Sequence, residues 1–233
     1  MKHLMVRALV GSVAHGLARP GSDLDVKEVY ALDTGEFFVI GDRRGYRTPK
    51  ASTPVDRLAD ADLTQYEVGH FLHLATKSNP SILEVMKTPR DRPEVILTSW
   101  GEPLLDLFPH VWNSHDVYHA FRGYGMSQRR RMQQGEGDAR DRKYACAWLR
   151  TLYNACDLLA TGTFSMDVTG TKIEGILRQW RTPGEPFFLA QAEALCGAWE
   201  ATLDRTFAEA PEKKVDYEPI NDFIITVRRE LFQ

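Results

Sequence analysis

The feature that most constrains the fold of this chain is a glycine–serine pair followed by two closely spaced acids. An apolar run at residues 5–10 leads directly into Gly11-Ser12, and Asp23-Leu24-Asp25 follows after ten further residues. From Asp23 to Ala31 the residues alternate with the period of a β-strand, and the two acids fall on one face. The order of these segments along the chain predicts a strand, a short helical turn, a tight turn and a second strand.

The two acids of this motif are suited to metal binding. Residues two positions apart in a strand share one face, with side chains roughly 6 to 7 Å apart. That spacing allows Asp23 and Asp25 to hold Mg²⁺, or Mn²⁺, because both ions prefer oxygen ligands. In nucleotidyl transfer two such ions, roughly 3.5 to 4 Å apart, bind the attacking and the leaving oxygen. The pair therefore predicts a catalytic metal site.

The residues around the acids are suited to phosphate. Gly11 lets the backbone come close to an anion, since no side chain obstructs the approach. Ser12 opens the predicted helical turn, where its hydroxyl and the backbone amides can bind phosphate oxygens. Helix capping is the alternative role of this serine. For Lys27, contact with phosphate and pairing with an acid are both open.

The rest of the chain divides into a mixed first half and a helical second half. Residues 33–58 look irregular, with one brief strand expected at Phe37–Ile40. A strand at Asp60–Glu67 leads into a helix at Val68–Thr76, and Pro80 can occupy the first turn of the next helix. Later helices are expected at Ser114–Gln134, Arg140–Ala160, Thr171–Arg181, Pro186–Ala210 and Pro219–Phe232. We predict an α+β fold.

Charge is unevenly distributed along the chain. The net charge is −3, which argues against a protein that binds polyanions over its whole surface. Residues 122–150 nevertheless carry eight basic residues and three acids. Lys143 and Arg150 lie two helical turns apart and share a helix face, so they are candidates for binding the phosphates of a nucleotide or a second substrate. A solvated basic face is the alternative.

Other features indicate a cytoplasmic protein with no membrane association. No apolar run approaches the roughly 18 to 20 residues that cross a bilayer, and the first residues lack the apolar stretch of a signal peptide. Cys146, Cys156 and Cys196 are expected to be reduced, buried and structural. His70 and His73 have helical spacing, but no further ligand completes a metal site there.

The run from Gly11 to Tyr30 resembles the signature of the DNA polymerase β-like nucleotidyltransferases. Ser22 before the first acid and Lys27 after the second belong to the same pattern. The chain is most similar to a bacterial and phage family of predicted nucleotidyltransferases. Tyr66–Glu84, a helix closed by Asn-Pro, resembles the second block of that family, and Lys143–Arg150 is a looser third block.

This resemblance implies a domain organisation and a third metal ligand. Residues 1–100 would form a small mixed β-sheet, palm-like catalytic domain, and residues 101–233 a helical substrate-binding domain. The superfamily has a third carboxylate on a strand beside the first two, and Asp62 is our preferred residue. Asp60, on the same strand face as Asp62, and Glu67, on the opposite face, remain alternatives.

The resemblance also implies the reaction. An acceptor hydroxyl or another nucleophile attacks the α-phosphate of an NTP, and pyrophosphate leaves. An RNA 3′ end such as that of tRNA, a protein side chain and a small molecule all remain open as acceptor, as do the preferred base and the oligomeric state. Two alternatives are a toxin–antitoxin component that modifies a partner protein or tRNA, and a non-catalytic nucleotide-binding protein.

Overall fold

The computed structural model describes residues 1–38, 61–135 and 139–232. The chain forms two compact units. Residues 1–77, 81–112 and 215–233 form a sheet unit, and residues 78–80 and 113–214 form a helical unit. The chain therefore leaves the sheet unit and returns to it at the end. The boundary predicted from sequence, at residue 100, differs from this division in the placement of residues 78–80, 101–112 and 215–233.

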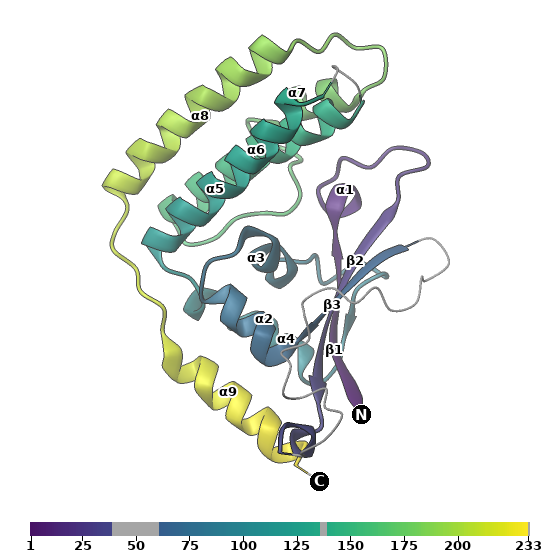
Figure 1. Ribbon diagram of the computed structural model, residues 1–233, viewed down its shortest axis with the longest axis vertical. Coiled ribbons are helices and arrows are strands. Elements are labelled where there is room, and N and C mark those ends of the chain that lie inside the picture. Colours follow the sequence, from purple (N-terminus) through teal and green to yellow (C-terminus); the bar gives the residue numbers. More distant parts are fainter. Residues whose placement is uncertain (39–60, 136–138, 233) are drawn as a thin grey trace. The chain divides into compact units, whose positions relative to one another are not determined.

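The sheet unit is built on a mixed sheet, as the α+β prediction requires. Its strands are β1 (Lys2–Val10), β2 (Leu24–Leu32), β3 (Ala61–Glu67) and β4 (Ile96–Leu97). Their order is β3-β2-β1-β4 (Figure 1), with β1 antiparallel to both β2 and β4, and β2 parallel to β3. No feature of the sequence had predicted the short edge strand β4.

The core of this unit forms where the strands meet their helices. Met5, Leu9 and Val29 of the strands are fully buried. The helix α2 (Val68–Ala75) has the predicted apolar spacing, and its Phe71 is fully buried as well. The remaining elements are α1 (Gly11–Ala14), α3 (Pro80–Met86), α4 (Gly101–Asp106) and the 3₁₀ turns η1 (Thr34–Phe37) and η2 (Phe108–His110). Pro80 occupies the first turn of α3, as predicted.

The last helix, α9 (Tyr217–Glu230), packs at the end of the sheet where both chain termini lie (Figure 1). Arg228 reaches across and pairs with Glu67 at 2.5 Å. Its guanidinium also lies 4.4 Å from the ring centroid of Phe37 in η1. The backbone N–H of Thr34 donates to the carbonyl of Leu231 at 2.9 Å. These contacts join segments that are distant in the sequence.

The helical unit consists of α5 (Ser114–Gln133), α6 (Ala139–Thr161), α7 (Glu174–Arg181) and α8 (Leu189–Glu209). In Figure 1, α5, α6 and α8 run side by side. Gly125 permits the close approach of α5 to α6, because a Cβ there would lie 2.8 Å from Cδ1 of Trp148. Asn113 caps α5 by accepting from the N–H of Asp116 at 2.7 Å.

Most of the expected elements are present, and one expectation is wrong. Phe37 and Phe38 are not part of the strand expected at Phe37–Ile40, because Phe37 belongs to the 3₁₀ turn η1 and Phe38 ends that turn. Residues 39 and 40 lie outside the described part. All three cysteines are buried, and none of them forms a disulfide in the described part of the chain. Burial raises the pKa of the Cys156 thiol to about 11, so this thiol is unreactive at neutral pH. No helix among the described residues could cross a membrane.

We expect Arg228→Ala to lower the free energy of unfolding by about 2 to 3 kcal/mol, because Glu67 would be left buried without its cation. Urea denaturation measures the change. The matched control is Arg229→Ala, which removes an exposed arginine from the same helix and should change the free energy by less than about 0.5 kcal/mol. Equal effects of the two substitutions would contradict the role assigned to the pair.

Candidate active site

The glycine–serine motif forms a single helical turn at the end of β1. The N–H of His15 donates to the carbonyl of Gly11 at 3.1 Å, and that of Leu17 to the carbonyl of Ser12 at 2.9 Å. His15 and Leu17 are buried, with 4 % and 6 % of their surface exposed. The buried side chains hold the loop against the core, while Ser12 remains partly exposed. The position of His15 is that of a packing residue.

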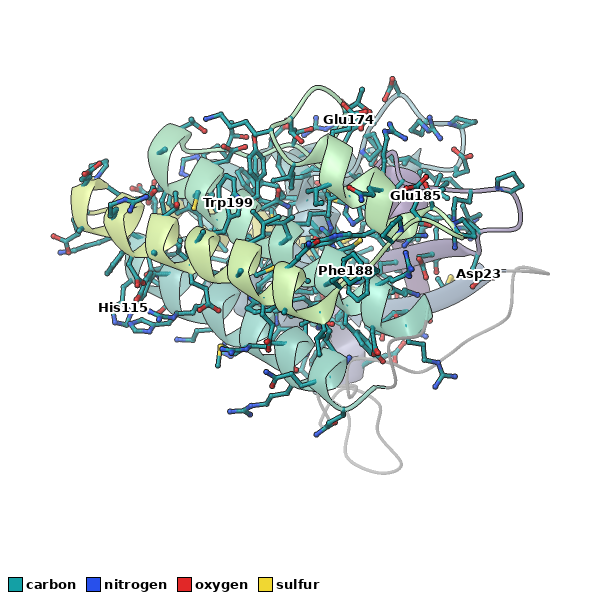
Figure 2. The ribbon with its side chains drawn as sticks, turned by 90° about the horizontal axis from the view of Figure 1, so that it is seen from above. Asp23, His115, Glu174, Glu185, Phe188 and Trp199 are labelled. Atoms are coloured by element: carbon teal, nitrogen blue, oxygen red, sulfur yellow. The ribbon has the colours of Figure 1, made fainter. Side chains whose placement is uncertain are left out.

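A tight turn then returns the chain to β2. The N–H of Ser22 donates to the carbonyl of Arg19 at 2.9 Å, and Ser22 Oγ accepts from the N–H of Arg19 at 2.8 Å. Gly21 at the third position has φ +80°, and Pro20 precedes it, as in a type II turn. The turn leads into Asp23, which is exposed and immediately precedes β2. Asp23 is labelled in Figure 2.

Asp25 lies closest to the glycine of the motif. Val10 is the register partner of Asp25 across β1 and β2, and Gly11 is the next residue. Gly11 has φ +67°, and a Cβ on it would lie only 1.9 Å from Oδ2 of Asp25. No residue other than glycine fits this position, both because of its backbone conformation and because of the carboxylate. The close neighbour of Gly11 in the structure is Asp25, and the predicted close approach of Gly11 to phosphate remains a prediction.

Asp62 occupies the position beside Asp25 on the neighbouring strand. The two residues are register partners in the parallel pair of β2 and β3. Neighbouring strands are about 4.8 Å apart, so Val10, Asp25 and Asp62 form one row across three strands. Glu67 lies five residues further along β3, about 16 Å away at 3.3 Å per residue. It is 5 % exposed, pairs with Arg228 and accepts from the N–H of Gly69 at 2.7 Å. Asp60 lies outside the described residues.

The set of acids fits a hard divalent cation. Asp25, Asp62 and the preceding Asp23 supply only carboxylate oxygens, which Mg²⁺ and Mn²⁺ prefer. Because Gly11 has no side chain, the carboxylate of Asp25 can lie directly against the Gly11 backbone. Among the described side chains, which do not include that of Asp62, no three His, Cys, Asp or Glu residues gather as a metal centre.

Lys27 follows Asp25 on the same strand and contacts the start of α3. Its ammonium donates to the carbonyl of Ser81 at 3.3 Å and to the hydroxyl of the same residue. The lysine therefore ties the strand that carries Asp25 to a helix of the same unit. Its predicted contact with phosphate remains a prediction.

Thr88 supports the end of β1 immediately before the motif. Its buried hydroxyl accepts from the N–H of Leu9 at 3.0 Å and donates to the carbonyl of Leu9 at 3.1 Å. On this side of β1, the pairing with β4 reaches only Val6 and Arg7. The threonine thus satisfies the backbone of Leu9 at a position that β4 does not reach. Neither Thr88 nor Ser81 could be recognised from the sequence, because each acts through contacts between distant segments.

Lys143 and Arg150, the predicted phosphate ligands of the helical half, belong to α6 of the helical unit. Lys143 is exposed, whereas Arg150 is only 8 % exposed. Two helical turns separate the residues, so they share a side of α6 but differ in their access to solvent.

Comparison with known protein families identifies the superfamily. The model of the RNA repair pathway DNA polymerase beta family, RlaP, matches residues 2–224. The chain belongs to this family. Polymerase β-like membership indicates an activity of the nucleotidyltransferase type, and such enzymes generally use divalent metals. A search of curated proteins gave no match.

We expect Gly11→Ala to displace the carboxylate of Asp25 and to lower the free energy of unfolding by about 2 to 4 kcal/mol, as strain and overlap add. Urea denaturation measures the change. Gly21→Ala is the matched control. Its φ is also positive, but nothing lies within 4 Å of an added Cβ, so it should cost only about 1 kcal/mol. Equal losses would show that the Asp25 carboxylate does not fill this space.

Thr88→Val should lower the free energy of unfolding by about 1 to 3 kcal/mol, because the N–H and carbonyl of Leu9 lose their buried partner. It should also lower the nucleotidyl-transfer rate, since β1 leads directly into Gly11. The control is Thr98→Val, which removes one hydrogen bond of 3.1 Å to the carbonyl of Met5, further from the motif. That variant should lose stability while its transfer rate is kept. Equal losses of the transfer rate in both variants would show that Thr88 has no particular role in supporting β1 beside the motif.

Proposed function

We propose that this chain transfers a nucleoside monophosphate from an NTP to a hydroxyl of an RNA acceptor, with Mg²⁺ or Mn²⁺ held by Asp23, Asp25 and Asp62. The observation that carries the proposal is the contact of Gly11 with the Asp25 carboxylate, in register with Asp62. The contact brings the backbone of Gly11 to the end of the sheet where Asp25 and Asp62 lie side by side. The family description, which names an RNA repair pathway, supports RNA as the acceptor class.

In this proposal the residues of the loop position the nucleotide. The backbone amides at Gly11 and Ser12, with the Ser12 hydroxyl, bind the triphosphate beside the acids. The metal ions, when bound, lower the pKa of the attacking hydroxyl and neutralise the charge that develops on the phosphates. Lys27 holds β2 against Ser81 and contributes positive charge near the carboxylates. Arg150 and Lys143 remain proposed phosphate ligands of the helical unit.

The reaction exchanges a phosphoanhydride bond of the NTP for a phosphoester bond to the acceptor. The acceptor oxygen forms a bond to the α-phosphorus, and the bond from that phosphorus to the oxygen bridging the β-phosphate breaks. Pyrophosphate leaves with the electron pair, and the proton of the hydroxyl passes to solvent. The carboxylates of Asp23, Asp25 and Asp62 have no covalent part in this exchange, so their substitution removes positioning and charge stabilisation.

Asp62 is the third acid in this proposal because of its place beside Asp25. Glu67 lies at the far end of β3, and its carboxylate is already bound by Arg228 and by the N–H of Gly69. A metal ligand at that end would lie beyond the reach of Asp23 and Asp25.

The experiment incubates the protein with each α-³²P-labelled NTP, Mg²⁺ and total cellular RNA, and measures the label joined to RNA. Asp23→Asn, Asp25→Asn and Asp62→Asn should each lower the rate by about a thousandfold or more, because several kcal/mol of charge stabilisation are lost. Asp222→Asn, at an exposed acid of α9, is the matched control and should keep the rate.

Three other outcomes would each contradict part of the proposal. Label joined to protein instead of RNA would overturn the acceptor. NTP binding with no transfer to any acceptor would favour a non-catalytic nucleotide-binding protein. A rate that survives Asp62→Asn but not Asp25→Asn would remove Asp62 from the metal site.

A further inference from the structure

Some of the positive charges on α5 and α6 of the helical unit are bound by neighbouring segments, and these form the first group. On α5, Arg122 pairs with Asp204 of α8 at 2.9 Å, and Arg129 pairs with Glu193 at 3.6 Å. Arg142 of α6 donates to the carbonyl of Glu185, a residue labelled in Figure 2, at 2.8 Å. The acidic helix α8 therefore neutralises the arginines on the side of α5 that faces it.

The second group lies on another side of the same helices. Arg131 follows Arg129 by two residues, which turns it about 200° around α5. Its guanidinium lies 5.9 Å from the ring centroid of Tyr144 on α6. Arg140 and Lys143 precede Tyr144 by four and one residues, so all three lie on one side of α6. Arg131, Arg140 and Lys143 are exposed, and Tyr144 is partly exposed. We call these four residues the arginine–tyrosine face.

One acid of the same segment does not belong to this face. Asp141 has only 1 % of its surface exposed. A Cβ on Gly135 would lie 1.8 Å from Oδ1 of Asp141, so this carboxylate is packed against the end of α5. Among the described side chains of residues 129–135 and 140–144, the exposed charged ones are therefore arginine and lysine, and the partly exposed ring of Tyr144 lies beside them.

We propose that the arginine–tyrosine face binds the sugar–phosphate backbone of a single-stranded RNA, with Tyr144 in contact with a base; this inference rests on the proposed transfer to RNA. Guanidinium and ammonium groups contact phosphates, which fixes the position of a nucleic acid without reading its sequence. Aromatic rings between such cations provide stacking for bases, a combination typical of sites for single strands. An acceptor held in this way is placed by its backbone and can vary in sequence.

The experiment measures the affinity for a fluorescein-labelled single-stranded RNA by anisotropy, across a range of salt concentrations and without NTP or metal. The double variant Arg131→Gln with Arg140→Gln should bind about tenfold or more weakly. The slope of log affinity against log salt should also fall by about 1.4, because each phosphate contact of a single strand contributes roughly 0.7.

The matched control is the double variant Arg205→Gln with Lys214→Gln. It removes two exposed positive charges of the same unit that lie outside the face, and it should keep both the affinity and the slope of the wild type. Tyr144→Leu should lower the affinity severalfold and keep the slope, because it removes stacking and no charge. Circular dichroism and thermal unfolding establish that each variant is folded.

The result separates this inference from the proposed function. Asp25→Asn should bind RNA as the wild type does and fail to transfer the nucleotide. A wild type that binds no RNA, or equal losses in the two double variants, overturns the arginine–tyrosine face whatever the transfer assay gives. RNA binding that depends on Arg131 and Arg140, in a protein that transfers no nucleotide, upholds the face and contradicts the proposed function.

Discussion

The contact between the backbone of Gly11 and the carboxylate of Asp25 is the constraint on which the candidate site depends. Oδ2 of Asp25 occupies the space that any side chain at position 11 would need, 1.9 Å from the position of a Cβ. The positive φ of Gly11 turns the chain sharply out of β1 at this point. The backbone of Gly11 and a carboxylate are thereby brought together, and the proposed function uses this proximity for a cation that binds carboxylate and phosphate at once.

The rest of the sheet unit holds this row of residues in place from both ends. At the end near the motif, the hydroxyl of Thr88 completes the backbone hydrogen bonds of Leu9. At the other end, α9 binds the end of β3 through Arg228 and Glu67. The row of Val10, Asp25 and Asp62 is therefore part of a sheet whose strands are fixed beyond their own pairing. In the proposed function, such fixed strands hold the backbone of the acids in place for cation binding.

The sequence allowed the strand–turn–strand unit that carries the candidate site to be predicted, because its signals are local. The spacing of Gly11, Asp23 and Asp25 and the turn at Pro20-Gly21 encode a strand–turn–strand unit within a few residues. The pairing of Asp25 with Asp62 and of Glu67 with Arg228 could not be derived in this way. The latter pair is separated by 161 positions, and only tertiary packing brings it together. The basic residues 122–150 were visible as a cluster, but which of them α8 neutralises depends on how α5, α6 and α8 pack.

The most direct measurement of the central claim is anomalous diffraction from crystals that contain Mn²⁺ and a non-hydrolysable NTP analogue. The account predicts anomalous peaks within about 2.0 to 2.4 Å of carboxylate oxygens of Asp23, Asp25 and Asp62, the range of metal–oxygen bonds to hard cations. It also predicts triphosphate oxygens at the amides of Gly11 and Ser12. Manganese bound away from Asp25, or a triphosphate bound away from the Gly11-Ser12 turn, would contradict it.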